Sequence, residues 1–436
     1  MSTSMKNVSL FVAVAALFIL TGFIQSWNSA LLNINIGLIG AVMALGVNMQ
    51  WGYAGLFNVG VMGFTALGGL AMVLIATPYD GGAWAAGGWR ILIALAIGAA
   101  TILGAVQTWI RLPKGKPRVL AMLAVLIVGF VLYRMVFDPA VSAVEAINPA
   151  SAGNIGGLGL PVLIAWPVGG LIAAGAGWLV AKTALGLRSD YLAIATLGIA
   201  EIIIAVLKNE DWLDRGVKNV TGLPRPFIVP LEVDLQNNAG FVQWAHSWGY
   251  DPLIASSIVV KLLYMVLFVI VLAIVLTLAE MALKSPWGRM MRAIRDNEDA
   301  AEAMGKDVKK RHLQIFVLGS AVIGIAGAMM ATYNGQFVPT TFQPLRWTFL
   351  IWVMVIVGGS GNNWGAVLGA MLIWLLWVQV EPLGKLLMHV ITMPLPDDSG
   401  LKQHLLDSTQ HMRLLTMGLV LLLVLRFSPR GLIPEK

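Results

Sequence analysis

Residues 257–279 read SIVVKLLYMVLFVIVLAIVLTLA, an apolar run with a single charged side chain, that of Lys261. A helix needs about 20 consecutive apolar residues to cross the hydrocarbon core of a bilayer, so this stretch is long enough to span a membrane. Backbone polar groups find no partner in lipid, and a helix satisfies them within its own segment. The stretch therefore predicts a transmembrane helix and indicates the fold class of the whole chain.

Similar apolar runs lie on both sides of this stretch. We predict membrane segments at residues 8–25, 31–49, 54–77, 90–110, 119–137, 160–180, 191–207, 257–279, 313–332, 347–357, 364–380 and 413–427. The segments 347–357 and 364–380 are short and flank Gly358-Gly359-Ser360-Gly361, so they are either half-helices, a re-entrant pair or two crossings. The chain is thus expected to be one all-α, polytopic transmembrane domain (1–436) of about 10–12 spans.

The composition agrees with a membrane protein. The 436 residues are 58% hydrophobic and 12% charged, whereas soluble domains carry roughly 25% charged residues. The chain has no cysteine, which excludes disulfides, thiolate catalysis and cysteine-ligated metal sites, and we expect no metal. Its net charge of +7 is not accompanied by a basic helix or by alternating aromatic and basic residues. We therefore expect membrane lipid around the chain and no nucleic-acid partner.

The distribution of Lys and Arg predicts the orientation. If the N-terminus is cytoplasmic, the inside loops 111–118, 181–190 and 280–312, with the tail from Arg426, hold most of the basic residues. The positive-inside rule therefore favours cytoplasmic termini. The long loop 208–256 is then extracytoplasmic, and it is either a docking surface for a binding protein or a solvated connector.

The cytoplasmic loop 280–312 contains the sequence SPWGRMMRAIRDNEDAAEAMGKDVKKRH at residues 285–312. Asp296 or Asn297 can cap a short helix whose first turn holds Glu298 near the positive end of the helix dipole. Gly305 suits a left-handed stop at the other end. Small side chains between the two ends allow close docking on a partner, but residue types alone support an ordinary basic loop on anionic lipid equally well.

Five segments carry a resemblance to a known family. Asn297–Gly305 is similar to "RAIREDEIAAEAMG", Ser189–Ile203 to "GDYLAIVTLGFGEI", and Val357–Gly365 to "LGGLGSIWGP". Arg426–Leu432 is similar to "RPQGLL", and Gly52–Gly69 to "GLSGLLSLGHGAFFGIGAY". In their order along the chain these segments resemble the LivM-type permeases of branched-chain amino-acid ABC importers, and the resemblance covers most of the chain.

The resemblance implies a permease in the inner membrane of a bacterial cell. It implies a second permease of similar fold, two cytoplasmic ATP-binding subunits and an extracytoplasmic solute-binding protein. The chain would translocate branched-chain or other hydrophobic amino acids without being an enzyme and without a cofactor, because the partner subunits bind the ATP. No GxxxxGK[ST] phosphate loop occurs in this sequence. The residues it assigns to ATPase coupling are Asp296, Glu298, Ala300, Ala301, Ala303 and Gly305.

Three residues are candidates for the translocation path. Glu201 is the acidic residue that falls within a predicted span, and a charged group facing lipid costs about 2.5–3.5 kcal/mol. We therefore expect Glu201 to face the bundle interior and to hydrogen-bond there, either lining the path or joining two helices. Asn58 and Thr196 are path candidates by position.

The chain departs from the family pattern at two places. Residues 90–155 resemble an insertion of two spans, and residues 218–224 read KNVTGLP where relatives often carry "TGGPNGI". The second departure leaves the substrate open, so urea, short amides and other small solutes are alternatives. An ion-coupled secondary transporter is a rival class, but it would need several buried carboxylates. An intramembrane enzyme would need a catalytic group in a span, and none of the five histidines lies in one.

Overall fold

The computed structural model describes residues 3–147, 153–393, 396 and 399–435. Its helices are α1 (Thr3–Ile24), α2 (Trp27–Val47), α3 (Val61–Ala71), α4 (Gly81–Ala83), α5 (Trp89–Arg111), α6 (Lys116–Glu145), α7 (Val162–Ala184), α8 (Ser189–Asn209), α9 (Asp211–Asp214), α10 (Glu232–Asn237), α11 (Ala239–Ser247), α12 (Pro252–Lys284), α13 (Pro286–Asp296), α14 (Glu298–Ala303), α15 (Val308–Asn334), α16 (Pro344–Gly358), α17 (Asn363–Thr392), α18 (Gly400–Asp407) and α19 (Met412–Phe427). The strands β1 (Val220–Thr221) and β2 (Gln336–Phe337) pair antiparallel. The all-α prediction is confirmed.

Most of each of the twelve predicted membrane segments lies in helix, although in the segment 54–77 the helix begins only at Val61. Among the described residues, nine helices are long and apolar enough to span a membrane, and the bent pair α18–α19 gives a tenth. Two shorter apolar helices, Val61–Ala76 and Pro344–Gly358, account for the remaining segments. The expectation that 364–380 is short was wrong, because α17 continues through Pro382 to Thr392 and is long enough to cross alone.

The centre of the bundle is built from α2, α3, α7, α15, α16 and α17, which hold most of the buried apolar side chains. Small residues bring these helices together. A methyl group on Gly324 of α15 would lie 2.5 Å from the Cβ atom of Ala173 on α7, and one on Gly68 of α3 would lie 2.6 Å from the carbonyl carbon of Gly324. Such distances leave no room for a side chain, so α3, α7 and α15 are in backbone contact, as helices in lipid often are.

Gly68→Ala should therefore lower the free energy of unfolding by about 1–3 kcal/mol, the usual cost of overpacking a filled interior. Gly175→Ala on α7 is the matched control, because a methyl group there would meet nothing within 4 Å. Thermal unfolding of the purified protein in detergent measures both. Equal melting temperatures for the two variants would contradict the close packing of α3 on α15.

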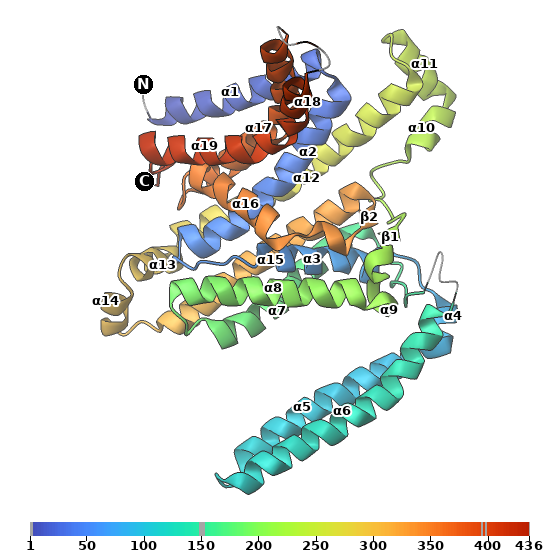
Figure 1. Ribbon diagram of the computed structural model, residues 1–436, viewed down its shortest axis with the longest axis vertical. Coiled ribbons are helices and arrows are strands. Elements are labelled where there is room, and N and C mark those ends of the chain that lie inside the picture. The colour runs from blue at the N-terminus through green and yellow to red at the C-terminus, as the bar shows by residue number, and fades with distance from the viewer. Residues whose placement is uncertain (1–2, 148–152, 394–395, 397–398, 436) are drawn as a thin grey trace.

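The predicted insertion 90–155 contains the helical hairpin of α5 and α6, which diverges from the other helices (Figure 1). Most of its surface is exposed, since 17% of the α5 span and 6% of the α6 span are buried. Its base is held by a small apolar cluster in which Phe137 of α6 stacks edge-to-face on Trp212. The hairpin is thus attached at one end, which fits a peripheral pair of helices.

Both chain ends lie at the same end of the molecule as α13 and α14, and α10 and α11 lie at the opposite end (Figure 1). The loop 208–256 is largely ordered into α9, β1, α10 and α11. Val220 pairs with Phe337 and Thr221 with Gln336, so this loop is tied to the end of α15. It therefore forms a structured cap on that end of the bundle.

Asp214 is a buried acid within this cap. Its Oδ1 accepts a hydrogen bond from the backbone N–H of Gly216 at 3.0 Å, while Oδ2 has no partner among the described residues. Burial raises the pKa of Asp214 to about 7, because an ionised carboxylate loses its hydration there. The folded state therefore binds a proton more tightly than the unfolded chain does.

The consequence is a pH-dependent stability. The contribution of Asp214 is fully present below its unfolded pKa of 3.8 and is lost as the pH rises through about 7. We expect unfolding to become easier by up to about 4 kcal/mol across this window, and Asp214→Asn to flatten the dependence. Melting temperatures of both proteins from pH 5 to pH 8 measure this. A wild-type profile that Asp214→Asn leaves unchanged would assign the pH dependence to other groups.

Candidate functional site

The predicted short helix in the cytoplasmic loop is present as α14, which follows α13 at a sharp corner. Asn297 is its cap, since the side-chain Oδ1 accepts a hydrogen bond from the backbone N–H of Ala300 at 2.9 Å. Asp296, the other predicted cap, ends α13 and instead accepts a hydrogen bond from Arg295 at 3.0 Å. The corner thus consists of two separately capped helices.

Gly305 ends this helix in the predicted left-handed conformation, with φ of 76°. The backbone N–H of Gly305 donates to the carbonyl of Glu302 at 2.8 Å, and that of Lys306 donates to Ala301 at 3.1 Å. These two bonds form a Schellman motif, which satisfies carbonyls that the helix end would leave open. The sequence from Asn297 to Lys306 therefore specifies a short, well-defined helix.

The small residues of α14 lie on different faces. Ala301 is buried against Ile294 and Val308, so it holds the corner between α13 and α15 together. Ala300 and Ala303 are exposed, and so is Glu298 in the first turn. Met304, next to the Gly305 stop, is 79% exposed. The outward face of α14 thus carries small side chains and is partly apolar, so another protein can approach its backbone closely.

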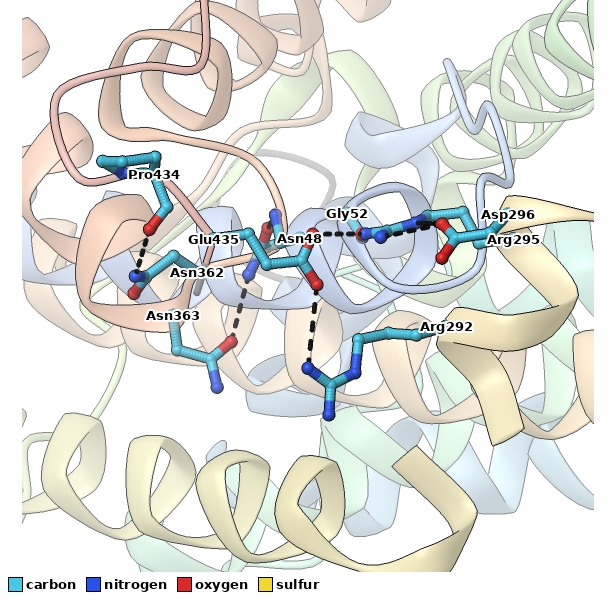
Figure 2. A network of polar contacts seen from close by, with 10 residues as sticks. Asn48, Gly52, Arg292, Arg295, Asp296, Asn362, Asn363, Pro434 and Glu435 are labelled. Atoms are coloured by element: carbon cyan, nitrogen blue, oxygen red, sulfur yellow. Dashed lines mark hydrogen bonds and ion pairs between the residues drawn. The ribbon is translucent and has the colours of Figure 1, made fainter. Parts of the chain in front are cut away.

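Arg295 connects this corner to two distant parts of the chain (Figure 2). Its Nη1 donates to Oε2 of Glu435 at 2.8 Å and to the carbonyl of Gly52. Burial works against the guanidinium charge, but the hydrogen bonds that Arg295 donates to the carboxylates of Glu435 and Asp296, with the negative charge of those groups, outweigh it and hold the pKa of Arg295 above its ordinary value. Arg292, one turn earlier on α13, lies 3.9 Å from Oε1 of Glu435.

A cavity of about 900 Å³ opens beside this ion pair. Four arginines line it, three from α13 and one from the C-terminal segment, with Asp296 and Glu435 as the lining acids: Arg289, Arg292, Arg295 and Arg430. Its walls also include Gly52 and Ser360, so it lies between the corner formed by α13 and α14 and the glycine-rich turn at residues 358–361. The excess of guanidinium groups gives this end of the molecule an anion-attracting hollow.

A second polar cluster, built around Asn48 and Asn363, lies next to the ion pair of Arg295 and Glu435. Asn48 donates from Nδ2 to Oδ1 of Asn363 at 3.0 Å and accepts from the backbone N–H of Gly361 at 2.9 Å. Asn363 in turn donates to Glu280 at 3.2 Å. The bond between Asn48 and Asn363 therefore joins the end of the second span to the start of α17 (Figure 2), and the bond to Glu280 adds the end of α12. The sequence analysis missed these residues, although buried asparagines in apolar segments were a usable signal.

Two of the three path candidates lie together. Asn58 donates to Oε1 of Gln50 at 2.8 Å and accepts from the backbone N–H of Gly60 at 2.8 Å. Thr196 on α8 accepts from the backbone N–H of Val59 at 3.0 Å. Gln50 also donates to Ser320 on α15 at 3.1 Å. Asn58 and Thr196 thus fix the loop before α3 against two neighbouring helices.

Glu201 does not face the bundle interior, contrary to expectation. Thr196, Ala200 and Ile204 form the buried stripe of α8, and the helical period places Glu201 about 100° away from Ala200, where it is exposed. No hydrogen bond or ion pair joins Glu201 to another described residue. The error arose because α8 packs on α3 and α7 along one side and leaves its other side uncovered within this chain.

A family model described as "Branched-chain amino acid transport system / permease component" matches residues 140–425. The high-affinity branched-chain amino acid transport system permease protein LivM of Escherichia coli is 32% identical over 48% of this chain and 48% of its own length. The chain thus spans about half of that relative.

Two other relatives differ in coverage. The probable branched-chain amino acid transport permease protein LivM of Methanocaldococcus jannaschii is 27% identical over 67% of this chain and 74% of its own. The xylose transport system permease protein XylH of Haemophilus influenzae is 31% identical over 24% of this chain and 29% of its own. No solved structure matches the chain.

Proposed function

Because this chain belongs to the family of branched-chain amino acid transport system permease components, we propose that it is the membrane-spanning permease of an ABC importer. Its cargo is a branched-chain or another hydrophobic amino acid, and separate ATP-binding subunits supply the energy. The observation that carries this proposal is α14, a capped helix with an exposed alanine face at the end of the bundle that also holds both chain ends.

We assign ATPase docking to the exposed face of α14, which includes Glu298, Ala300 and Ala303. Ala301 and Gly305 serve this face indirectly, since one packs the corner and the other ends the helix. Asp296 acts through its ion pair with Arg295. This end of the molecule is then cytoplasmic, and the chain lies in the inner membrane of a bacterial cell. The cap of α9, α10 and α11 faces the solute-binding protein.

We assign the uncovered side of α8 to the second permease subunit and to the path between the two. Glu201 supports this assignment, because a carboxylate facing lipid costs about 2.5–3.5 kcal/mol and a water-filled path or a polar partner removes that cost. Asn58 and Thr196 do not line this path in our assignment; they stabilise it indirectly, because their hydrogen bonds hold the loop before α3 in place.

The substrate assignment is tested by parallel uptake of labelled leucine and labelled urea into cells that express the chain with its neighbouring ATPases and binding protein. Leucine uptake that excess isoleucine and valine suppress, without urea uptake, supports the proposal. Urea or acetamide uptake with no response to leucine would replace the amino-acid assignment and leave the permease assignment standing.

A further inference from the structure

We propose that the C-terminal segment Ser428–Glu435 is a mechanical link that transmits movement of α13 to the turn between α16 and α17. Glu435 is the positioning residue that closes this link, and it does so by pairing with Arg295. The inference rests on the proposed function, since it assigns a route within the permease for movement that the ATPases impose on α13 and α14.

One end of the segment is bonded to the turn through backbone groups. Leu432 donates its N–H to the carbonyl of Val357 at 2.9 Å, and Ile433 donates to Gly358 at 2.9 Å. The side chain of Ile433 is 1% exposed and belongs to an apolar cluster with Leu368 on α17. The segment therefore follows the end of α16 and the start of α17 if these move.

Two glycines let the segment and the turn meet without intervening side chains. Gly431 has φ of 78°, and a methyl group there would lie 2.5 Å from the backbone nitrogen of Gly359. Gly359 has φ of 118°, and a methyl group there would lie 2.9 Å from the carbonyl carbon of Ile433. Either methyl group would push the two backbones apart, so the contact requires glycine on both sides.

The other end of the segment is bonded to α13. Pro434 accepts a hydrogen bond from Nδ2 of Asn362 at 3.1 Å, which brings Glu435 next to Gly361 and points its carboxylate toward Arg295 (Figure 2). Arg295 and Glu435 lie 2.8 Å apart, with side chains that are 24% and 26% exposed. A continuous route of short bonds therefore runs from the coupling corner to the turn.

The partial exposure of this ion pair suits a link that moves. A fully buried pair would be costly to shift, and an exposed one would contribute little. Arg295 also donates to the carbonyl of Gly52, so the same guanidinium connects α13 to the end of the second span. A displacement of α13 thus acts on both sides of the cavity lined by Arg289 and Arg430.

The test uses two lesions, Glu435→Gln at the α13 end of the link and Gly431→Ala at the turn end, and Arg426→Gln as the matched control. Arg426 lies on α19 just before the segment and does not line the cavity; it is exposed, and no ion pair joins it to the described residues. The full complex in proteoliposomes is assayed for ATP hydrolysis and for solute uptake together. We expect both lesions to lower uptake per ATP hydrolysed by roughly five- to ten-fold while the control stays at the wild-type ratio.

A merely structural role gives a different result. If the segment only caps the end of α16, the lesions lower the yield and the melting temperature of the complex but leave uptake per ATP unchanged, and this would overturn the inference. If the wild-type complex shows no ATP-driven uptake, the proposed function fails first and the inference fails with it. The two failures are therefore distinguishable.

A covalent replacement for the ion pair gives a second readout. The chain contains no cysteine, so Arg295→Cys with Glu435→Cys introduces the two thiols alone. A short bis-methanethiosulfonate reagent, which forms a disulfide with each of the two thiols and releases methanesulfinate, should restore uptake per ATP in the double variant, and reduction should abolish it again. Cross-linked complex that stays uncoupled would show that the connection between these positions does not transmit the movement.

Discussion

Replacing Ala300 by Trp should lower ATP-driven uptake by about 10–100-fold while the permease still inserts and folds. Ala300 is exposed on α14, so the indole has space in the isolated chain and no interior contact is broken. In the assembled importer the same indole would stand between α14 and the ATPase groove. Uptake, together with the amount of ATPase subunit that co-purifies with the permease, measures the effect.

Ala100→Trp is the matched control, because Ala100 is an equally exposed alanine on α5, in the outlying hairpin. It should leave uptake and co-purification near wild type. Ala301→Asp is less informative than Ala300→Trp, since Ala301 is packed against Ile294 and Val308 and a carboxylate there would disrupt the corner itself. Normal uptake by Ala300→Trp would mean that this face of α14 does not dock the ATPase.

Asn58→Ala should lower the free energy of unfolding by about 2–4 kcal/mol, because it leaves two buried groups without partners. These are Oε1 of Gln50 and the backbone N–H of Gly60, both of which now bond to the Asn58 side chain. Asn58 is 1% exposed, so water cannot replace it readily. Unfolding of the purified protein in a denaturing detergent series measures the loss.

Asn209→Ala serves as the control for this substitution, because Asn209 is exposed and, within the part of the chain that the structure describes, its side chain bonds only to the carbonyl of Ala205 in its own helix. Its unfolding free energy should change by less than about 0.5 kcal/mol. If Asn58→Ala unfolds like wild type but transports poorly, Asn58 would belong to the path itself rather than to its support.

The local features of the fold were predictable because short-range chemistry determines them. The Asn297 cap and the Gly305 stop define α14 within a few residues, and the apolar runs define the twelve membrane segments. The length of the span at α17 was underestimated. The helix continues through Pro382, although a proline inside a helix often kinks or ends it.

The long-range features could not be predicted in the same way. Arg295 and Glu435 are 140 positions apart, and only the packing of the C-terminal segment against α16 brings them together. Within residues 192–207 of α8 every position except Thr196 and Glu201 is apolar or glycine, so periodicity could not indicate which side meets the bundle. The predicted orientation of Glu201 was wrong for that reason, since its side chain is exposed within this chain.

Uptake of labelled leucine by the purified complex in proteoliposomes, with ATP supplied on the side of α14, tests directly whether this chain is an importer permease. We expect accumulation that requires both the binding protein and hydrolysable ATP, and that stops when a non-hydrolysable analogue replaces ATP. Leucine accumulation that proceeds without ATP and instead follows an ion gradient would contradict this expectation and identify the chain as a secondary carrier.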